Sequence, residues 1–178
     1  CDKQIIPSDS DASVYWISNP TNVFEGNVAS GGAFGFWYVM PEKPNGLSRQ
    51  KYEKNDAFKP RLMPLLKFDN NVAHSARKSG VMVDEFQNMD GTIGDGSYTP
   101  KVGPYGKNDP QPPKIAHFTN SVFYKNRNHG FWARGQHMHF DNLKFFDNTK
   151  GFQAVVMPAV IENSLFVCET PNIGTPFS

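Results

Sequence analysis

Two consecutive stretches, Phe118-Thr-Asn-Ser-Val-Phe123 ending at His129-Gly130 and Phe140-Asp-Asn-Leu-Lys-Phe145 ending at Lys150-Gly151, repeat one pattern. Each runs from an aromatic residue through Asn and a second apolar position to Gly. The pattern recurs at residues 24–35, 68–80 and 161–174, with Gly26 in place of Asn in the first copy. Five copies in 178 residues indicate a repeat architecture.

The spacing of the repeat glycines predicts the size of the unit. The intervals from Gly130 to Gly151 and from Gly151 to Gly174 are 21 and 23 residues, whereas the two earlier intervals are 45 and 50. The period is therefore about 22 residues, and each long interval is one period plus an inserted loop. The abundance of Gly, Pro and Phe and the lack of a helical period favour short strands. We therefore expect an all-β chain folded as a parallel β-helix.

The repeats are expected to form one domain. We assign residues 13–178 to the β-helix and residues 1–12 to a polar lead-in segment. Two long loops, at residues 41–64 and 87–113, each leave after the strand that follows a repeat Gly, so both should project from one side. The chain begins at Cys1 with neither Met nor a signal-peptide core, which we interpret as a fragment of a longer protein.

The charge balance argues against two classes of partner, nucleic acids and anionic membrane surfaces. The chain carries 18 basic and 17 acidic residues with no run of either sign, so the basic surface of a nucleic-acid-binding protein is missing. No apolar stretch approaches the roughly 20 residues of a transmembrane segment. The two cysteines, Cys1 and Cys168, permit one disulfide without requiring it, and both alternatives stay open.

Alignment of the copies predicts stacked columns of side chains. An aromatic column and a second apolar column should fill the core, while an Asn column should occupy a turn, because Asn tolerates a left-handed backbone. After each Gly, alternate residues should point inward and outward. The columns are Phe24, Phe68, Phe118, Phe140 and Ile161; Ala29, Ala73, Phe123, Phe145 and Phe166; Gly26, Asn70, Asn120, Asn142 and Asn163; inward Phe36, Val81, Phe131 and Phe152; outward Trp37, Met82, Trp132 and Gln153.

The outward row suggests a glycan-binding surface. Trp37 and Trp132 would offer aromatic faces to sugar rings, while Arg134 and Asp84 beside them would bind polar groups, Arg134 also a sugar carboxylate. The alternative is that the long loops fold back and bury these tryptophans. Both interpretations stay open.

Three further hypotheses concern catalysis and metals. Asp141 and Glu162 follow one another in an acidic row, and neighbouring strands bring carboxyl groups close to the spacing of a retaining glycosidase; a solvated acidic row is the simpler alternative. His117, His137 and His139 would bind a transition metal if they met on adjacent coils. The Gly-rich loop with Asp90 and Asp95 is a hypothetical Ca²⁺ site, although its spacing is not that of an EF-hand.

Several segments resemble one known family. The resemblance covers about residues 13–176 and is to the β-helix region of the cell-migration-inducing hyaluronidase, the cell-surface transmembrane hyaluronidase and the fibrocystin-like proteins. It rests on Trp16-Ile-Ser-Asn-Pro-Thr-Asn22, Gly35-Phe-Trp-Tyr38, Asn71-Val-Ala-His-Ser75, Asn128-His-Gly-Phe-Trp-Ala-Arg-Gly135, Asn163-Ser-Leu-Phe-Val167 and Asn172-Ile-Gly-Thr175.

This resemblance implies a right-handed β-helix in an extracellular or cell-surface protein. In some members this region is associated with binding and depolymerising hyaluronan, but the resemblance transfers no catalytic residue to this chain. The functional expectation is therefore a module that binds an extracellular glycan, with enzyme activity left open. The competing expectation is a non-catalytic structural or adhesion module.

Overall fold

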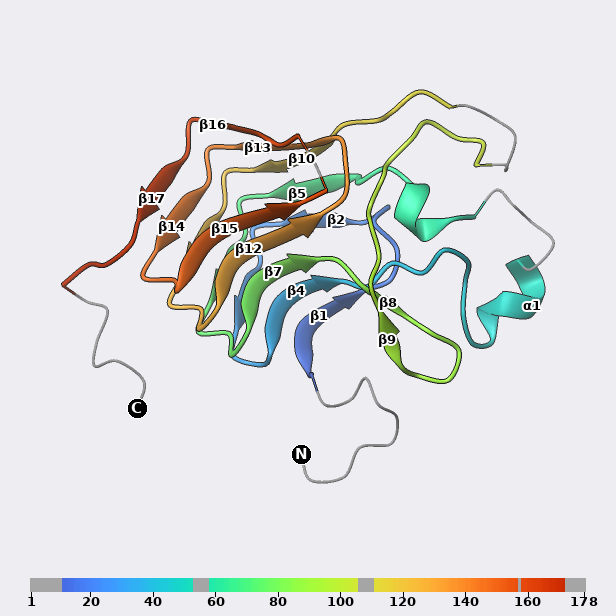
Figure 1. Cartoon of the computed structure of the whole chain (residues 1–178), viewed down its shortest axis with the longest axis horizontal. Coiled ribbons are helices and arrows are strands. Elements are labelled where there is room, and N and C mark those ends of the chain that lie inside the picture. The colour runs from blue at the N-terminus through green and yellow to red at the C-terminus, as the bar shows by residue number, and fades with distance from the viewer. Residues whose placement is uncertain (1–10, 53–57, 106–110, 157, 172–178) are drawn as a thin grey trace.

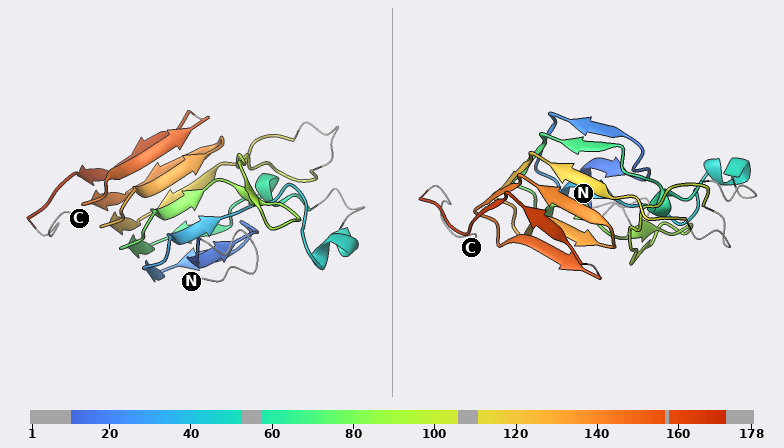
Figure 2. Two further views of the ribbon diagram at one scale, coloured as in Figure 1. Left: turned by 60° about the horizontal axis from the view of Figure 1, so that its bottom comes forward. Right: turned by 90° about the horizontal axis from the view of Figure 1, so that it is seen from above.

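The computed structural model describes residues 11–52, 58–105, 111–156 and 158–171. Within them, three five-stranded parallel sheets stack coil upon coil along the molecule, as Figures 1 and 2 show. Each turn of the chain contributes one strand to each sheet. The predicted parallel β-helix is confirmed, and the first strand begins at Ser13.

The first sheet has the longest strands, and the other two have strands of three or four residues. In spatial order, the first sheet contains β1 (Ser13–Ile17), β4 (Phe34–Tyr38), β7 (Ser79–Val83), β12 (His129–Arg134) and β15 (Lys150–Val155). The second contains β16 (Val160–Glu162), β13 (Met138–Asp141), β10 (Ala116–Thr119), β5 (Lys67–Asp69) and β2 (Val23–Glu25). The third contains β17 (Leu165–Val167), β14 (Lys144–Phe146), β11 (Val122–Tyr124), β6 (Val72–His74) and β3 (Val28–Ser30).

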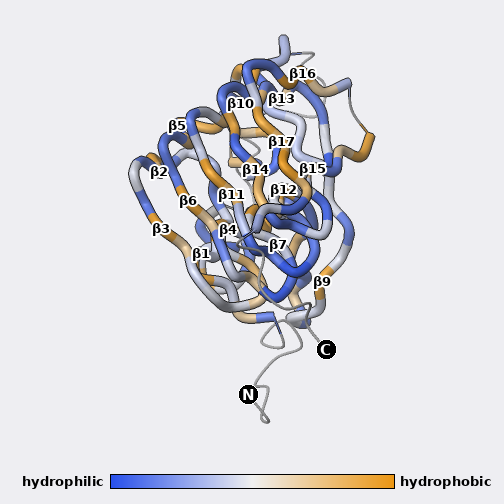
Figure 3. The backbone as a smooth tube through the Cα atoms, turned by 90° about the vertical axis from the view of Figure 1, so that its left-hand side faces the viewer, coloured by the Kyte–Doolittle hydropathy of each residue, from blue (hydrophilic) through white to orange (hydrophobic). Residues whose placement is uncertain are grey.

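The interior is a stack of aromatic rings in the predicted register. Phe118 pairs with Phe140, their ring centroids lie 5.4 Å apart, and both side chains are buried. Phe123 pairs with Phe145 in the third sheet in the same way. Complete burial of one such side chain contributes about 1.5–3 kcal/mol. In Figure 3 the apolar segments of the third sheet alternate with hydrophilic turns, the pattern that places the core between the sheets.

The Asn column forms the predicted left-handed turn. Asn70, Asn120, Asn142 and Asn163 have φ values of 50–52°, and Gly26 has φ 67°. The Asn142 amide donates to Oδ1 of Asn120 at 2.8 Å, 22 residues earlier. The amides of Asn120 and Asn163 donate instead to Asp69 and Asp141 of the preceding coils, so these turns are also bonded to their neighbours, and the coil length agrees with the predicted period.

The repeat glycines are needed where adjacent coils approach each other. A Cβ on Gly130 would lie 2.6 Å from the carbonyl oxygen of Gly151 and 2.7 Å from Cδ1 of Phe145. A Cβ on Gly80 would likewise lie 2.7 Å from the carbonyl oxygen of Gly130. Only glycine leaves room for the next coil at these positions.

The two predicted loops leave the carboxyl ends of β4 and β7 and lie at the same end of the first sheet (Figure 1). The first contains α1 (Ser48–Tyr52) and the 3₁₀ helix η2 (Pro60–Leu62), short helices that the all-β prediction did not include. The second contains the antiparallel hairpin of β8 (Phe86–Gln87) and β9 (Ile93–Gly94). No helix among the described residues is long and apolar enough to span a bilayer.

Candidate functional site

The outward row of the first sheet is in the predicted register and is one coil longer than predicted. The strand pairs align Trp16, Trp37, Met82, Trp132 and Gln153. Sequence analysis missed Trp16 because β1 precedes the first copy of the repeat and has no repeat Gly. The exposed fraction of Trp16 is 41%, so this member of the row is accessible.

Trp37 is not accessible. Its side chain is 1% exposed and packs in a second small core with Phe34 and Val39. Ile93 of β9 packs against the same core, together with Met82. For Trp37 the loops do bury the ring, because the hairpin after β7 folds back over the middle of the row, and it therefore offers no face to a sugar.

Trp132, Arg134 and Asp84 are brought together as the row predicted. Asp84 follows β7 and is buried, and its Oδ2 accepts hydrogen bonds from Trp132 Nε1 at 2.8 Å and Arg134 Nε at 2.7 Å. Its Oδ1 accepts from the backbone N–H groups of Glu85 and Gly96. Charge-assisted bonds of this kind satisfy a buried carboxylate. Asp84 therefore holds two partly exposed side chains in place.

Two acidic residues extend this cluster. The guanidinium of Arg134, with 24% of its side chain exposed, lies 3.8 Å from the exposed carboxylate of Asp95. Glu85, which sequence analysis missed, has a left-handed backbone with φ 69°. Burial, followed by the charge of Asp84, raises the pKa of Glu85 to about 7, while Lys78 opposes the shift. Its only sequence signal is its place after Asp84 at the end of a core strand.

The proposed catalytic pair lies on a different sheet. Asp141 and Glu162 are cross-strand neighbours. Oδ1 of Asp141 accepts a hydrogen bond from Asn163 at 2.8 Å, and Oε1 of Glu162 lies 2.9 Å from His139 Nε2. The predicted acidic row is therefore in register, and a catalytic role for the pair remains a prediction.

Two of the three histidines predicted to bind a metal are brought together. His117 and His139 are neighbours with ring centroids 5.1 Å apart, but His137 has φ 58° and lies before β13, outside the strand alternation assumed for it. Partial burial, then the charges of His139 and Lys114, lower the pKa of His117, while Asp141 opposes the shift. Across the described residues, no three or more His, Cys, Asp or Glu side chains are grouped to hold a metal ion.

The predicted calcium loop has no such group either. Asp90 uses Oδ1 to accept hydrogen bonds from the backbone and hydroxyl of Thr92, at 3.0 and 2.6 Å, which closes a local turn. Asp95 lies beside Arg134 instead. Cys168 is an exposed free thiol, and Cys1 lies outside the described residues.

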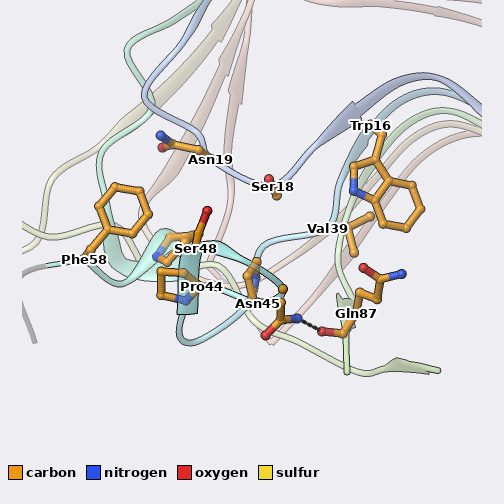
Figure 4. Close-up of a pocket in the computed structure, with 12 residues that line it drawn as sticks. Trp16, Ser18, Asn19, Val39, Pro44, Asn45, Ser48, Phe58 and Gln87 are labelled. Carbon is orange, nitrogen blue, oxygen red and sulfur yellow. Dashed lines mark hydrogen bonds between the residues drawn. The ribbon is translucent and has the colours of Figure 1, made fainter. Parts of the chain in front are cut away.

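A cavity of about 500 Å³ lies between the end of β1 and the loop after β4. Figure 4 shows Trp16 and Phe58 on opposite sides of this space, with Asn19 and Asn45 between them. Gln87 of β8 also lines the cavity, and its backbone carbonyl accepts a hydrogen bond from Asn45. Sequence analysis missed this site because its walls come from segments far apart in the chain.

Comparison with known proteins agrees with the fold. Residues 2–81 match the family model described as CEMIP beta-helix. The chain is 32% identical to the mouse cell migration-inducing and hyaluronan-binding protein, and the alignment covers 92% of the chain. It is 28% identical to the human cell surface hyaluronidase CEMIP2 over 91% of the chain. It is also 28% identical to mouse Fibrocystin-L over 82% of its length.

The aligned region is a small part of each relative. The chain spans 13% of the length of the first two proteins and 3% of Fibrocystin-L. Parallel strands in stacked sheets and the CEMIP beta-helix match agree with each other. Over most of its length, this chain is therefore similar to the β-helix region of the CEMIP hyaluronidases and fibrocystin-like proteins.

Proposed function

We propose that this chain is an extracellular or cell-surface β-helix module that binds an acidic glycan, hyaluronan first among them, at Trp132 and Arg134. One observation carries the proposal. The buried carboxylate of Asp84 fixes both the indole N–H of Trp132 and the guanidinium of Arg134, so an aromatic ring and a cation lie side by side on the first sheet.

The geometry suits a sugar that carries a carboxylate. A ring face of the sugar stacks on the partly exposed indole, and the carboxylate pairs with the guanidinium N–H groups that Asp84 does not use. Gln153, the cross-strand neighbour of Trp132, adds a polar side chain beside the ring. Asp84 acts as a positioning residue, because a side chain that is 3% exposed does not reach the ligand itself.

The names of two relatives support this ligand. One is called hyaluronan-binding and another a hyaluronidase, and both align with nine-tenths of the chain. If the module also takes part in hydrolysis, Asp141 and Glu162 are the proposed acid and nucleophile. Cross-strand neighbours lie about 4.8 Å apart, near the separation of about 5–5.5 Å that a retaining mechanism requires.

The decisive experiment is retention on immobilised hyaluronan, with the size of soluble hyaluronan followed on a gel. We expect the chain to be retained, and Trp132→Ala and Arg134→Ala each to weaken binding about tenfold or more. Lys144→Ala is the matched control, because it removes one positive charge from an exposed position on the third sheet. Unchanged retention of both site variants would contradict the proposal.

The same assay separates the functional classes. Retention with chain shortening that is lost in the double variant Asp141→Asn, Glu162→Gln indicates a hydrolase using that pair. Retention without shortening indicates a binding module. Absence of both outcomes favours the alternative, a non-catalytic structural or adhesion module like a fibrocystin-type protein, to which the similarity with Fibrocystin-L also points.

A further inference from the structure

The cavity in Figure 4 has two aromatic walls on different supports. Trp16 belongs to β1 and is held by an edge contact with Trp37, at a centroid distance of 5.0 Å. Phe58 comes from the loop after β4 and faces Trp16 across the space. The volume of about 500 Å³ falls within the range of about 300–1,000 Å³ that is usual for sites that bind small molecules.

The described residues that line the cavity carry no charge. All of the described residues that line it are apolar, hydroxyl-bearing or amide-bearing, with Gly46 and three prolines completing the wall. Among these described lining residues, a charged ligand would lose part of its hydration without gaining a counter-ion. The lining therefore favours an uncharged ligand with both apolar and polar surfaces.

The polar groups of the lining are arranged to donate and to accept. Oδ1 of Asn19 accepts a hydrogen bond from the backbone of Thr21 at 2.9 Å, which orients the side chain and leaves its N–H₂ group as a donor. Asn45 donates to the carbonyl of Gln87 and keeps its own Oδ1 as an acceptor. The exposed hydroxyls of Ser18 and Ser48 do both. Sugar hydroxyls match this set, because each can donate and accept.

We propose that this cavity binds a neutral sugar unit of a glycan, with one ring face stacked on Trp16 and its hydroxyls bonded to Asn19 and Asn45. An indole offers the large flat face that the apolar side of a pyranose ring covers. This inference goes beyond the proposed function, because it assigns a second ligand class to a second place.

The exposed Trp16 and the partly exposed Trp132 are separated by the β8–β9 hairpin. Trp16 and Trp132 belong to the same outward row but are three strands apart, or roughly 14 Å at the usual strand spacing. Between them, Trp37 and Met82 pack with Ile93 of the hairpin. The neutral cavity and the Trp132 surface are therefore separate sites, and loss of one should leave the other intact.

The test is titration of the chain with uncharged oligosaccharides, using chitotetraose, cellotetraose and mannotetraose, by calorimetry and by tryptophan fluorescence. We expect saturable binding of at least one of them, and a loss of about tenfold or more in affinity in Trp16→Ala. Val14→Ala is the matched control, since Val14 has a similar exposed fraction on the same strand and does not line the cavity.

A second variant keeps the test valid if removal of Trp16 loosens β1. Ser48→Trp places a large ring in the cavity from an exposed position of α1, and Leu47→Trp places the same ring at the neighbouring, fully exposed position that does not line it. We expect only Ser48→Trp to abolish binding. The proposal is overturned if none of the three saccharides binds, or if both Trp16→Ala and Ser48→Trp leave their binding unchanged.

The two proposals fail independently. Retention on hyaluronan with no binding of any neutral saccharide would remove the cavity site and leave the Trp132 surface. Neutral saccharide binding that depends on Trp16, with no retention on hyaluronan, would do the opposite.

Discussion

At the scale of single residues, Asp84 matters most because four donors converge on one buried carboxylate. In Asp84→Asn the amide keeps only one acceptor oxygen and leaves the guanidinium of Arg134 without its negative partner. We expect the free energy of unfolding in urea to fall by about 3 kcal/mol, as for other broken buried pairs, and binding to hyaluronan to weaken. Asp95→Asn is the control, since its side chain is 80% exposed and should change stability by less than about 0.5 kcal/mol. Equal effects of the two substitutions would show that Asp84 does not position the site.

Glu85 predicts a pH dependence at the same site. Its pKa of about 7 in the folded protein lies above the ordinary value of 4.5, so between these values the folded state binds a proton that the unfolded state releases. The stability that this proton contributes is present in full below about pH 4.5 and is lost as the pH rises to about 7. Glu85→Gln should therefore raise the free energy of unfolding at pH 8, by roughly 1 kcal/mol after allowance for partial exposure, and leave it nearly unchanged at pH 4.

The same proton should affect ligand binding. Protonation of Glu85 removes a negative charge near Arg134, so hyaluronan affinity measured by calorimetry should rise as the pH falls from 8 to 6. Burial lowers the pKa of His129, which contacts Trp132, so its protonation is shifted to a lower pH than that of an ordinary histidine. Glu85→Gln should flatten the profile. A variant that keeps the full pH dependence would assign it to another group.

At the scale of the elements, the first sheet depends on glycines that let coils stack. Gly130→Ala would press a methyl group against the carbonyl oxygen of Gly151 and the ring of Phe145. We expect a loss of about 1–3 kcal/mol in the free energy of unfolding, measured in urea, because adjacent coils have to separate. Gly26→Asn is the contrasting substitution, with φ 67° and no atom within 4 Å of its Cβ position. It installs the residue that the other coils carry there and should change stability by less than about 1 kcal/mol. A comparable loss in both variants would refute the close-approach explanation.

The elements that sequence analysis located are those with a period. Phe118 and Phe140 were placed in register correctly because every coil repeats the same spacing of core residues. The contact of Asp84 with Trp132 and Arg134 was partly predictable, because the aligned repeats place both partners on the coil that follows the coil of Asp84. The burial of Trp37 was not predictable, because it depends on Ile93, which lies in a Gly-rich loop without periodicity. Only the tertiary packing of that loop decides which face of the sheet the loop covers. The Trp16 cavity escaped for the same reason, since loop residues complete it.

At the scale of the whole molecule, each coil packs only on its neighbours, so the solenoid should tolerate the loss of one whole coil. Deletion of residues 143–163 joins Asn142 to Ser164, which takes the position of Leu143 in the coil, and removes one period. The remaining columns keep their inward and outward alternation, and both Trp132 and the Trp16 cavity remain.

We therefore expect this deletion to leave a folded β protein by circular dichroism, less stable but able to bind both classes of glycan. Deletion of residues 143–153 removes half a period and is the control. It joins a turn to the middle of β15, so core residues would face water and the stacked coils would lose their partners. That variant should be unfolded or aggregated. If the two deletions behave alike, stability resides in contacts that cross several coils, and the two glycan sites would then be parts of one cooperative unit.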